Sequence, residues 1–346
     1  MNDKPAISVI ISTYNRCELL RSSIASLLAQ ETEGVSFEVI VVDNNSTDNT
    51  RQIVRSIIER GATNLRYVFE PKQGVSYGRN AGIESARGEI VAFTDDDVQV
   101  SRDWIATIKR VLDEHAEADF VGGKVLPQAN GKFPRWLTRE HWMPLAILDY
   151  GDAPLPISGH NKLGLVTANF AVRREVFQKV GLFSPDLQRV RDHIGSIEDQ
   201  ELQMRIWRDG RKGLYAPELV VTAEVPADRL TKAYHRRWHR GHGHFYALLR
   251  SDDMEQSSKG RLFDVPAHLY RQAMADVIQW LKLSAIGKRD EAFENETRLY
   301  FFAGFFAKRR ADYLHDKPRN LLREIAGFIR SLVGTKKNRN AQEETG

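Results

Sequence analysis

The chain has 346 residues, of which 42% are hydrophobic and 28% are charged. This length suits one large domain with an appendage or two domains of typical size, and 24 Gly with 12 Pro exclude collagen-like and low-complexity chains. The single cysteine, Cys17, excludes a disulfide framework, and a formal net charge of +4 is too small to indicate a nucleic-acid-binding protein.

Short β-branched runs alternate with segments of helical periodicity in the first half of the chain. This alternation predicts βα units around a parallel sheet. The predicted strands are Ser8–Thr13, Phe37–Asp43, Leu65–Phe69, Glu89–Thr94 and Asp119–Val125. The predicted helices are Glu18–Gln30, a helix capped at Asn45–Thr47 that closes at Gly61, Ser76–Ala86 and Trp104–His115.

The second half is less regular. Pro127–Leu165 is rich in Pro, Gly and Trp, and we expect a long functional or mobile connection there. The remaining elements are a strand at Val166–Val172, a short helix near Glu175, a helix at Glu198–Asp209 and a strand at Leu219–Ala223, after which the chain is predicted to be helical from Asp228 on.

No segment is apolar enough to cross a membrane. The longest apolar run, Leu299–Ala307, has nine residues, whereas a spanning helix needs about 20. Residues 1–6 lack a basic segment followed by an apolar stretch, so we expect no signal peptide and a cytoplasmic location.

Acidic residues stand where predicted parallel strands end. Asp43 ends one strand, and Asp95–Asp97 follow another. Because the carboxyl ends of parallel strands meet at one crevice, we expect these side chains to lie together. Three adjacent carboxylates repel one another, which makes sense if Mg²⁺ or Mn²⁺ binds there and phosphate oxygens complete its shell. The alternative is a solvated acidic turn or a helix cap.

Five segments resemble the successive motifs of family 2 glycosyltransferases, in the same order and with similar spacing. They are Val9–Arg16 (VIISTYNR), Val41–Asp48 (VVDNNSTD), Gly78–Gly82 (GRNAG), Phe93–Asp97 (FTDDD) and Ile197–Arg205 (IEDQELQMR). The resemblance covers about residues 6–225. It implies an α/β fold of the GT-A type, whose mixed, mostly parallel central sheet is flanked by helices. A nucleotide-sugar half (1–125) would be fused to an acceptor half (126–228), followed by a helical basic region (229–346).

The same resemblance implies a metal-dependent, hexosyltransferase-type enzyme that uses a nucleotide diphosphate sugar. Asp97, with Asp95, would bind the metal. The residues implied to contact the donor are Thr13, Tyr14, Asn15, Arg16, Asp43, Arg79, Asn80, Asp95 and Asp96. Asp43 has the alternative of being a turn residue, and Arg79 and Asn80 that of a solvated helix face.

Inverting sugar transfer needs a base that takes the proton of the acceptor hydroxyl. Asp199 stands where the family keeps this base, and Glu198 would raise its pKa or contact the acceptor. The alternative is that both acids only complement a helix N-terminus, while Glu201 and Arg205 form an i,i+4 pair.

The segment Tyr234–His244 concentrates His and Arg residues. It could bind the donor diphosphate or the phosphate of a lipid-linked acceptor. The candidates, assigned together with Asn169, are Arg236, Arg237, Trp238 and His239. The alternative is a basic surface helix with Trp238 packed inward.

The sequence of the C-terminal region predicts a basic amphipathic helix. The segment from Lys308 to Asn340 contains ten Lys and Arg but only three acids. Apolar residues recur at helical spacing at Leu321, Leu322, Ile325, Phe328, Ile329 and Leu332, preceded by Phe301, Phe302, Phe305 and Phe306. This pattern predicts peripheral binding to the inner face of an anionic membrane; the alternative is a helix packed on the domain.

Two other functions are compatible with single features. Gly74–Gly78 matches the G-x-S-x-G pattern of serine hydrolases, with Ser76 as nucleophile. Four residues, Glu70–Gln73, separate it from the preceding strand, whereas a nucleophile elbow needs the strand to run into the turn. A non-catalytic basic module that binds lipid or nucleic acid would leave the strand-end acids unexplained. The sequence therefore predicts an inverting glycosyltransferase that modifies a saccharide, a lipid-linked or a polysaccharide-precursor acceptor.

Overall fold

The computed structural model describes residues 4–128, 133–188, 194–255 and 260–316. The chain divides into two compact units. Unit 1 comprises Met1–Phe133, Trp142–His193 and Ile197–Leu230, and unit 2 comprises Pro134–His141, Ile194–Ser196 and the chain from Thr231 on. The division therefore falls close to the expected one at residue 228, but two short segments that we expected in the first domain belong to unit 2.

Unit 1 is built on a mixed sheet with the strand order β3-β2-β1-β4-β8-β6-β9-β5, and β7 pairs with β9. Its strands are β1 (Ile7–Thr13), β2 (Phe37–Asp43), β3 (Leu65–Phe69), β4 (Ile90–Asp95), β5 (Val98–Val100), β6 (Phe120–Pro127), β7 (Leu155–Ile157), β8 (Phe170–Arg173) and β9 (Gly213–Ala223). β1 to β4, β6 and β9 run in one direction, and β5, β7 and β8 run against them. The sheet is thus mixed and mostly parallel, as the sequence predicts.

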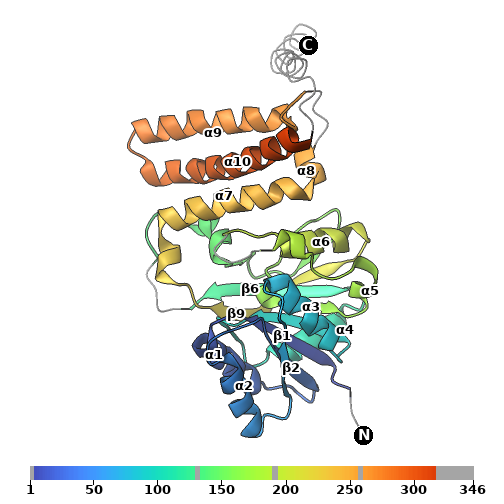
Figure 1. Ribbon diagram of the computed structural model, residues 1–346. Helices are drawn as coiled ribbons and strands as arrows, with labels where there is room; N and C mark the ends of the chain where they lie inside the picture. The colour runs from blue at the N-terminus through green and yellow to red at the C-terminus, as the bar shows by residue number, and fades with distance from the viewer. Residues whose placement is uncertain (1–3, 129–132, 189–193, 256–259, 317–346) are drawn as a thin grey trace. The chain divides into compact units, whose positions relative to one another are not determined.

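The alternation of side chains along each strand gives the sheet two buried faces. On β1, Val9 and Ile11 face a core that includes side chains of α1, α2 and α4, whereas Ile10 faces a core shared with α3, α5 and α6. Figure 1 shows α1 and α2 on one side of the sheet and α6 on the other. The helices of unit 1 are α1 (Cys17–Leu28), α2 (Thr50–Glu59), α3 (Val75–Ser85), α4 (Trp104–Glu114), α5 (Val176–Val180) and α6 (Glu198–Arg208).

Local structure departs from the sequence expectation at two helix or strand starts. α2 begins at Thr50 rather than near Asn45, because Asp48 Oδ1 accepts the Thr50 amide (3.0 Å) and holds the preceding residues in a turn. β9 begins at Gly213 rather than at Leu219. Its pairing with β6 jumps from Tyr215 to Val220 across an irregularity that contains Pro217, a residue that sheets tolerate only at such places.

Two further expectations, for residues 127–173, need correction. The predicted strand Val166–Val172 starts with a 3₁₀ turn at Thr167–Asn169, and only Phe170–Arg173 is strand. The segment Pro127–Leu165, expected to be irregular, contributes β7 and the short 3₁₀ turns Arg139–His141 and Met143–Leu145.

Unit 2 is mainly helical, with a short hairpin that the sequence did not predict. Its elements are α7 (Lys232–Leu249), α8 (Asp252–Glu255), β10 (Arg261–Leu262), β11 (Val265–Pro266), α9 (Ala267–Ala285) and α10 (Arg289–Asp316). Figure 1 shows α10 between α7 and α9. A Cβ on Gly243 of α7 would lie 2.0 Å from the Phe301 carbonyl oxygen, and one on Gly304 of α10 would lie 1.9 Å from that of Arg240. Glycine at both positions therefore lets the two helices touch through their backbones.

The phenylalanines of α10 belong to the core of unit 2. Phe302 and Phe305 are buried with Ala247 and Leu269, so the alternative of a helix packed on the domain applies to this part of the predicted membrane-binding pattern. Its other apolar residues, from Leu321 to Leu332, lie outside the described residues. Within the described parts of the chain, no helix has the length and apolar character that crossing a bilayer requires.

Candidate functional site

The carboxyl ends of β1, β2 and β4 lie at one edge of the sheet in unit 1. Thr13 at the end of β1 is the register partner of Asp43 on β2, and Ser12 is the partner of Asp95 on β4. Asp96 and Asp97 follow β4 directly. The strand register thus brings the predicted acidic residues to the same edge.

Two of the three consecutive aspartates form ion pairs with the same arginine. Arg16 Nη1 lies 3.0 Å from both Asp96 Oδ1 and Asp97 Oδ2. The hydroxyl of Thr13 donates to Asp96 Oδ2 (2.7 Å), and Asp96 is 5% exposed. Burial alone would lower the pKa of Arg16, but the neighbouring Asp96 and Asp97 carboxylates outweigh it and raise that pKa. Thr13, Arg16 and Asp96 therefore hold the loop after β4 in place.

Asp95 remains the more accessible acid of this run. Its side chain is 38% exposed, and Oδ1 lies 3.6 Å from Arg79 Nη2. Its surroundings raise the pKa of Asp95 to about 6: burial contributes most, the carboxylates of Asp97, Asp96 and Asp199 add to it, and Arg79 opposes them. The cluster thus carries more negative charge than its arginines neutralise.

Asp95 and Asp97 fit a divalent cation whose other ligands are phosphate oxygens and water. Asp95 and Asp97 supply hard oxygen donors, and the carboxylates of Asp96, Asp97 and Asp199 around Asp95 make a negative field that a cation would relieve. The described part of the chain contains no group of three or more His, Cys, Asp or Glu side chains arranged to hold a metal. Two protein carboxylates together with phosphate oxygens and water would suffice, because Mg²⁺ usually keeps such a shell.

Arg79 on α3 links this acidic edge to the first turn of α6. Its Nη1 lies 2.6 Å from Asp199 Oδ1 and 3.1 Å from Glu198 Oε1. Its guanidinium is 8% exposed and also lies over the ring of Phe183. Burial would lower the pKa of Arg79, but the charges of Asp199, Asp95 and Glu198 outweigh it and raise that pKa. Arg79 was expected to contact the donor; the structure places it beside the predicted base.

Glu198 and Asp199 differ in access, although they are neighbours in the sequence. The Asp199 side chain is 30% exposed, whereas that of Glu198 is 5% exposed. Glu198 therefore has little surface for an acceptor and balances the charge of Arg79. The expected pair of Glu201 and Arg205 is present, with Nε to Oε1 at 2.7 Å. Of the acids in this turn, Asp199 is the most exposed.

Two expected contact residues have different roles in the structure. Asn169 is fully buried: its Oδ1 accepts from Trp104 Nε1, and its Nδ2 donates to the carbonyls of Lys124 and Leu219. Its assignment to the acceptor or diphosphate is therefore wrong, because every polar group of its amide is used inside the core. Asn80 pairs through both amide atoms with the backbone of Phe183, so it fixes that loop instead of lying on a solvated face.

Asp43 makes the contacts of a turn residue, which was the alternative to a ligand-binding role. Its Oδ1 accepts the Ser46 amide (2.9 Å), its Oδ2 accepts the Tyr67 hydroxyl (2.7 Å), and the residue is 2% exposed. Burial, together with this hydrogen bond, raises the pKa of Tyr67. The role of Asp43 toward a nucleotide base stays a prediction.

The residues after β1 form a loop that is fixed on one side and open on the other. Asn15 adopts a positive φ of 52° and accepts the Thr47 amide at 2.7 Å. Tyr14 is 43% exposed. Asn44, which sequence reasoning missed, ties the loop after β2 to the loop between β3 and α3 through the Lys72 carbonyl and the Gly74 amide. Only its place in the motif after β2 could have indicated this role.

Ser76 does not have the geometry of a hydrolase nucleophile. It is fully buried in the first turn of α3, and its hydroxyl donates to the Ser184 carbonyl at 3.1 Å. Its amide donates to Gln188 Oε1. β3 ends at Phe69, so the strand does not run into the turn, and the serine hydrolase alternative is wrong.

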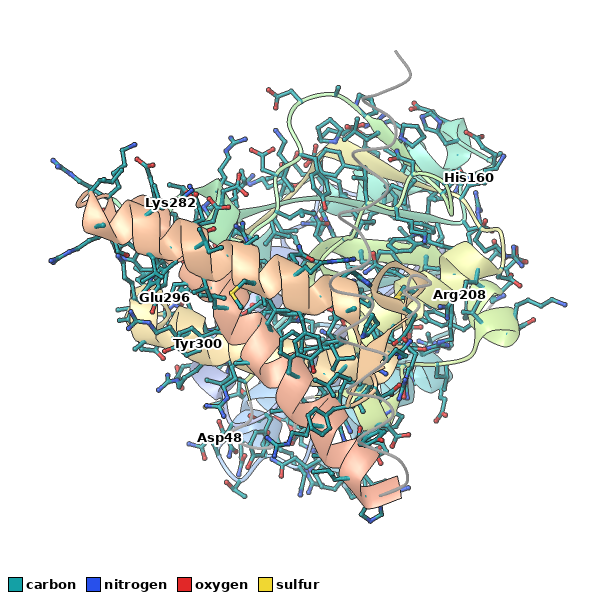
Figure 2. The ribbon with its side chains drawn as sticks, turned by 90° about the horizontal axis from the view of Figure 1, so that it is seen from above. Asp48, His160, Arg208, Lys282, Glu296 and Tyr300 are labelled. Atoms are coloured by element: carbon teal, nitrogen blue, oxygen red, sulfur yellow. The ribbon has the colours of Figure 1, made fainter. Side chains whose placement is uncertain are left out.

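The four basic and aromatic candidates on α7 all belong to unit 2. Arg236 Nε lies 2.8 Å from Glu296 Oε1 of α10, the residue labelled in Figure 2. Trp238 stacks on His242 with ring centroids 4.6 Å apart, whereas Arg237 is exposed. Trp238 is therefore packed as the alternative predicts, and the acceptor role of Arg236, Arg237 and His239 stays a prediction.

Two buried imidazoles on α7 should make unit 2 sensitive to acid. Burial lowers the pKa of His239 to about 3 and that of His242 to about 4, whereas an unfolded histidine has a pKa of about 6.5. The unfolded chain therefore binds more protons between these values, and the free energy of unfolding should fall as the pH drops from about 6.5 to about 4. Urea titrations at several pH values would measure this slope. His239→Gln should flatten it, and an unchanged slope would contradict the assignment.

Comparisons with known proteins identify the family of the chain. A model of the family described as Glycosyl transferase family 2 matches residues 8–181. The chain is 29% identical to an uncharacterised glycosyltransferase of Nostoc sp., over 73% of this chain and 71% of that protein. It is 27% identical to a glucosyl-dolichyl phosphate glucuronosyltransferase of Haloferax volcanii, over 60% of this chain and 66% of that protein.

A solved structure supports the fold. The mannosyltransferase from Pyrobaculum calidifontis in complex with GDP-Man and Mn²⁺ superimposes with a TM-score of 0.57 at 19% identity, covering 91% of this chain and 89% of that one. Similarity at this level concerns the fold alone. The expected central sheet flanked by helices, with further helices at the C-terminal side, is thereby confirmed.

Proposed function

The chain belongs to glycosyl transferase family 2, and on that premise we propose that it is an inverting enzyme that transfers a sugar to the hydroxyl of a lipid-linked acceptor, with Asp199 as the base. The observation that carries this proposal is the ion-pair cluster in which Arg79 meets Asp95, Glu198 and Asp199. It brings Asp95, which ends β4, together with Glu198 and Asp199 of α6. Sugar transfer needs both a group that binds the donor and a base for the acceptor hydroxyl.

The reaction assigned to these residues balances as follows. The acceptor oxygen forms a bond to the anomeric carbon while the bond from that carbon to the diphosphate oxygen breaks. The proton of the hydroxyl passes to Asp199, and the nucleoside diphosphate leaves with the electron pair. Asp95 and Asp97 would hold Mg²⁺ or Mn²⁺, which stabilises negative charge on the diphosphate when bound. Arg79, 3.6 Å from Asp95, and Arg16, 3.0 Å from Asp97, are cations that could also offset this charge.

A lipid-linked acceptor is supported by one relative and by the charge of the C-terminal region. The Haloferax volcanii protein is named for a dolichyl-phosphate-linked sugar. In this chain, ten Lys and Arg against three acids from Lys308 to Asn340 would favour an anionic membrane surface. We therefore place the enzyme at the cytoplasmic face of a membrane, bound peripherally.

Nucleotide and metal together should stabilise the protein against heat. A nucleoside diphosphate at a hundred times its Kd adds about 2.7 kcal/mol to the free energy of unfolding, which corresponds to a Tm increase of roughly 5–10 °C for a unit of this size. Differential scanning fluorimetry with UDP, GDP and other nucleoside diphosphates, each with Mn²⁺ and with EDTA, measures the increase and identifies the base.

The variant Asp97→Ala should lose the metal-dependent part of this increase. Asp113→Ala is the matched control, because Asp113 is an exposed acid on α4 that pairs only with Lys109 among the ion pairs described. If no nucleoside diphosphate raises the Tm of the wild-type protein with either metal, the proposed reaction is wrong.

A further inference from the structure

Helix α9 carries large apolar side chains on the face that it turns away from unit 2. Met274, Ile278 and Leu281 are 60%, 48% and 54% exposed, and Ile286, which follows the helix, is 68% exposed. The spacing of four and three residues puts the first three on one side of the helix. Exposed apolar residues are common singly, but a contiguous row of them marks a binding surface. We call Met274, Ile278, Leu281 and Ile286 the α9 stripe.

The opposite side of α9 accounts for its packing. Leu269 is buried in the core of unit 2 with Phe302 and Phe305, and the only acid of the helix, Asp276, is buried and pairs with Arg298 of α10 at 2.7 Å. α9 is therefore already anchored without the stripe. Figure 2 shows α9 lying over α10, with Lys282 labelled on α9.

All exposed charges of α9 are positive. Arg271 and Lys282 are exposed and adjoin the stripe in the helical projection. Beyond the helix, Lys288 pairs with Glu291 and Arg289 is followed by Asp290, so these charges offset one another. An apolar row bordered by basic residues, with the one acid turned inward, is the composition of helices that lie in the surface of an anionic bilayer.

Charge also decides between the candidate occupants of the stripe. In a symmetric pairing of two copies through this face, the basic borders of both would meet, which costs free energy. The chain after Asp316 contains seven Lys and Arg against three acids, so it carries the same sign. Anionic lipid is the occupant whose charge complements this surface.

We infer that the α9 stripe, with Arg271 and Lys282, is the surface through which the protein lies on an anionic membrane. This inference rests on the membrane association proposed above. It moves the apolar contact with the bilayer from the phenylalanines of α10, which belong to the core, to an exposed face of α9. The helix would lie parallel to the bilayer, with the stripe among the acyl chains and the two basic side chains at the lipid phosphates.

Vesicle co-sedimentation of the full chain tests the inference. We expect the wild-type protein to bind vesicles of phosphatidylcholine with phosphatidylglycerol more strongly than vesicles of phosphatidylcholine alone. The variant Met274→Gln/Ile278→Gln/Leu281→Gln keeps good helix formers on α9. It should lower the partition coefficient by about tenfold or more. Arg271→Gln/Lys282→Gln should lower it by about fivefold for each charge removed, and only with the anionic vesicles.

Met143→Gln is the matched control, because Met143 is a 63% exposed methionine in unit 1. It should bind vesicles like the wild type, and every variant should keep the wild-type Tm. Unchanged or tighter vesicle binding by the triple variant overturns the inference; a stripe covered by a second copy or by the chain after Asp316 would give that result. Sedimentation velocity of the wild type and the triple variant identifies the second copy in that case.

Vesicle binding tests the membrane surface independently of the proposed transfer reaction. The Tm increase with nucleotide and metal should be the same in the triple variant and in the wild type, because α9 belongs to unit 2 and the strand-end acids belong to unit 1. Absence of that increase in both proteins would refute the proposed reaction and leave the membrane surface standing. Absence of wild-type binding to anionic vesicles would refute the membrane surface and leave the reaction standing.

Discussion

Asp199→Asn should lower the rate of sugar transfer by roughly 10²–10⁴-fold, the usual contribution of a positioned general base. Asparagine keeps the size of the side chain and can still accept a hydrogen bond from Arg79, which lies 2.6 Å from Asp199 Oδ1. It has no carboxylate to take the proton of the acceptor hydroxyl. Nucleotide binding should therefore survive, and the loss should appear in kcat. Steady-state transfer assays and the nucleotide-dependent Tm increase measure the two effects separately.

Glu201→Gln is the matched control for this substitution. Glu201 lies in the same first turn of α6, but its carboxylate is bound to Arg205. Its replacement should cost some stability and leave the transfer rate within a few-fold of the wild type. A near-normal rate for Asp199→Asn would exclude Asp199 as the base.

Arg79→Met should be strongly destabilising as well as inactivating. Arg79 is the cation beside the buried Glu198, whose side chain is 5% exposed. Breaking a buried ion pair by removing one partner costs about 3–5 kcal/mol, because an uncompensated charge stays in the interior. We expect the free energy of unfolding to fall by this amount in urea titrations at neutral pH.

The double variant Arg79→Met/Glu198→Gln should recover a good part of that stability, since the second substitution removes the buried charge. It should not recover transfer, because Asp95 and Asp199 then lack their shared cation. Arg102→Met is the surface control: Arg102 is 81% exposed and pairs with an exposed Glu31, so the change should cost less than about 1 kcal/mol. Equal stability of Arg79→Met and Arg102→Met would contradict the buried-pair interpretation.

Contacts within unit 1 corrected several roles that the sequence alone left open. Asn80 and Asn169 were expected to meet a ligand, yet both amides bond to backbone or core groups. Asn169 bonds to the carbonyls of Lys124 and Leu219 and to the indole of Trp104. A motif identifies such residues as important, but it does not distinguish a side chain that binds a ligand from one that holds the loop which does.

The sequence by itself determined the order of strands and helices in unit 1 and the position of its acids at strand ends. β2 and β3 lie where the pattern places them, because alternation and turn residues are local properties of the chain. The register of neighbouring parallel strands then follows closely enough to bring Thr13, Asp43 and Asp95 to one edge.

Only the tertiary structure decided which charges meet and which apolar faces stay uncovered. Arg79 and its partners on α6 are 119 and 120 residues apart, and no periodicity records a contact between distant segments. Likewise, helical spacing marks both the phenylalanines of α10 and the stripe of α9 as apolar faces. Packing buries Phe305 completely and leaves Met274 60% exposed, because a pattern specifies that a face is apolar without specifying what covers it.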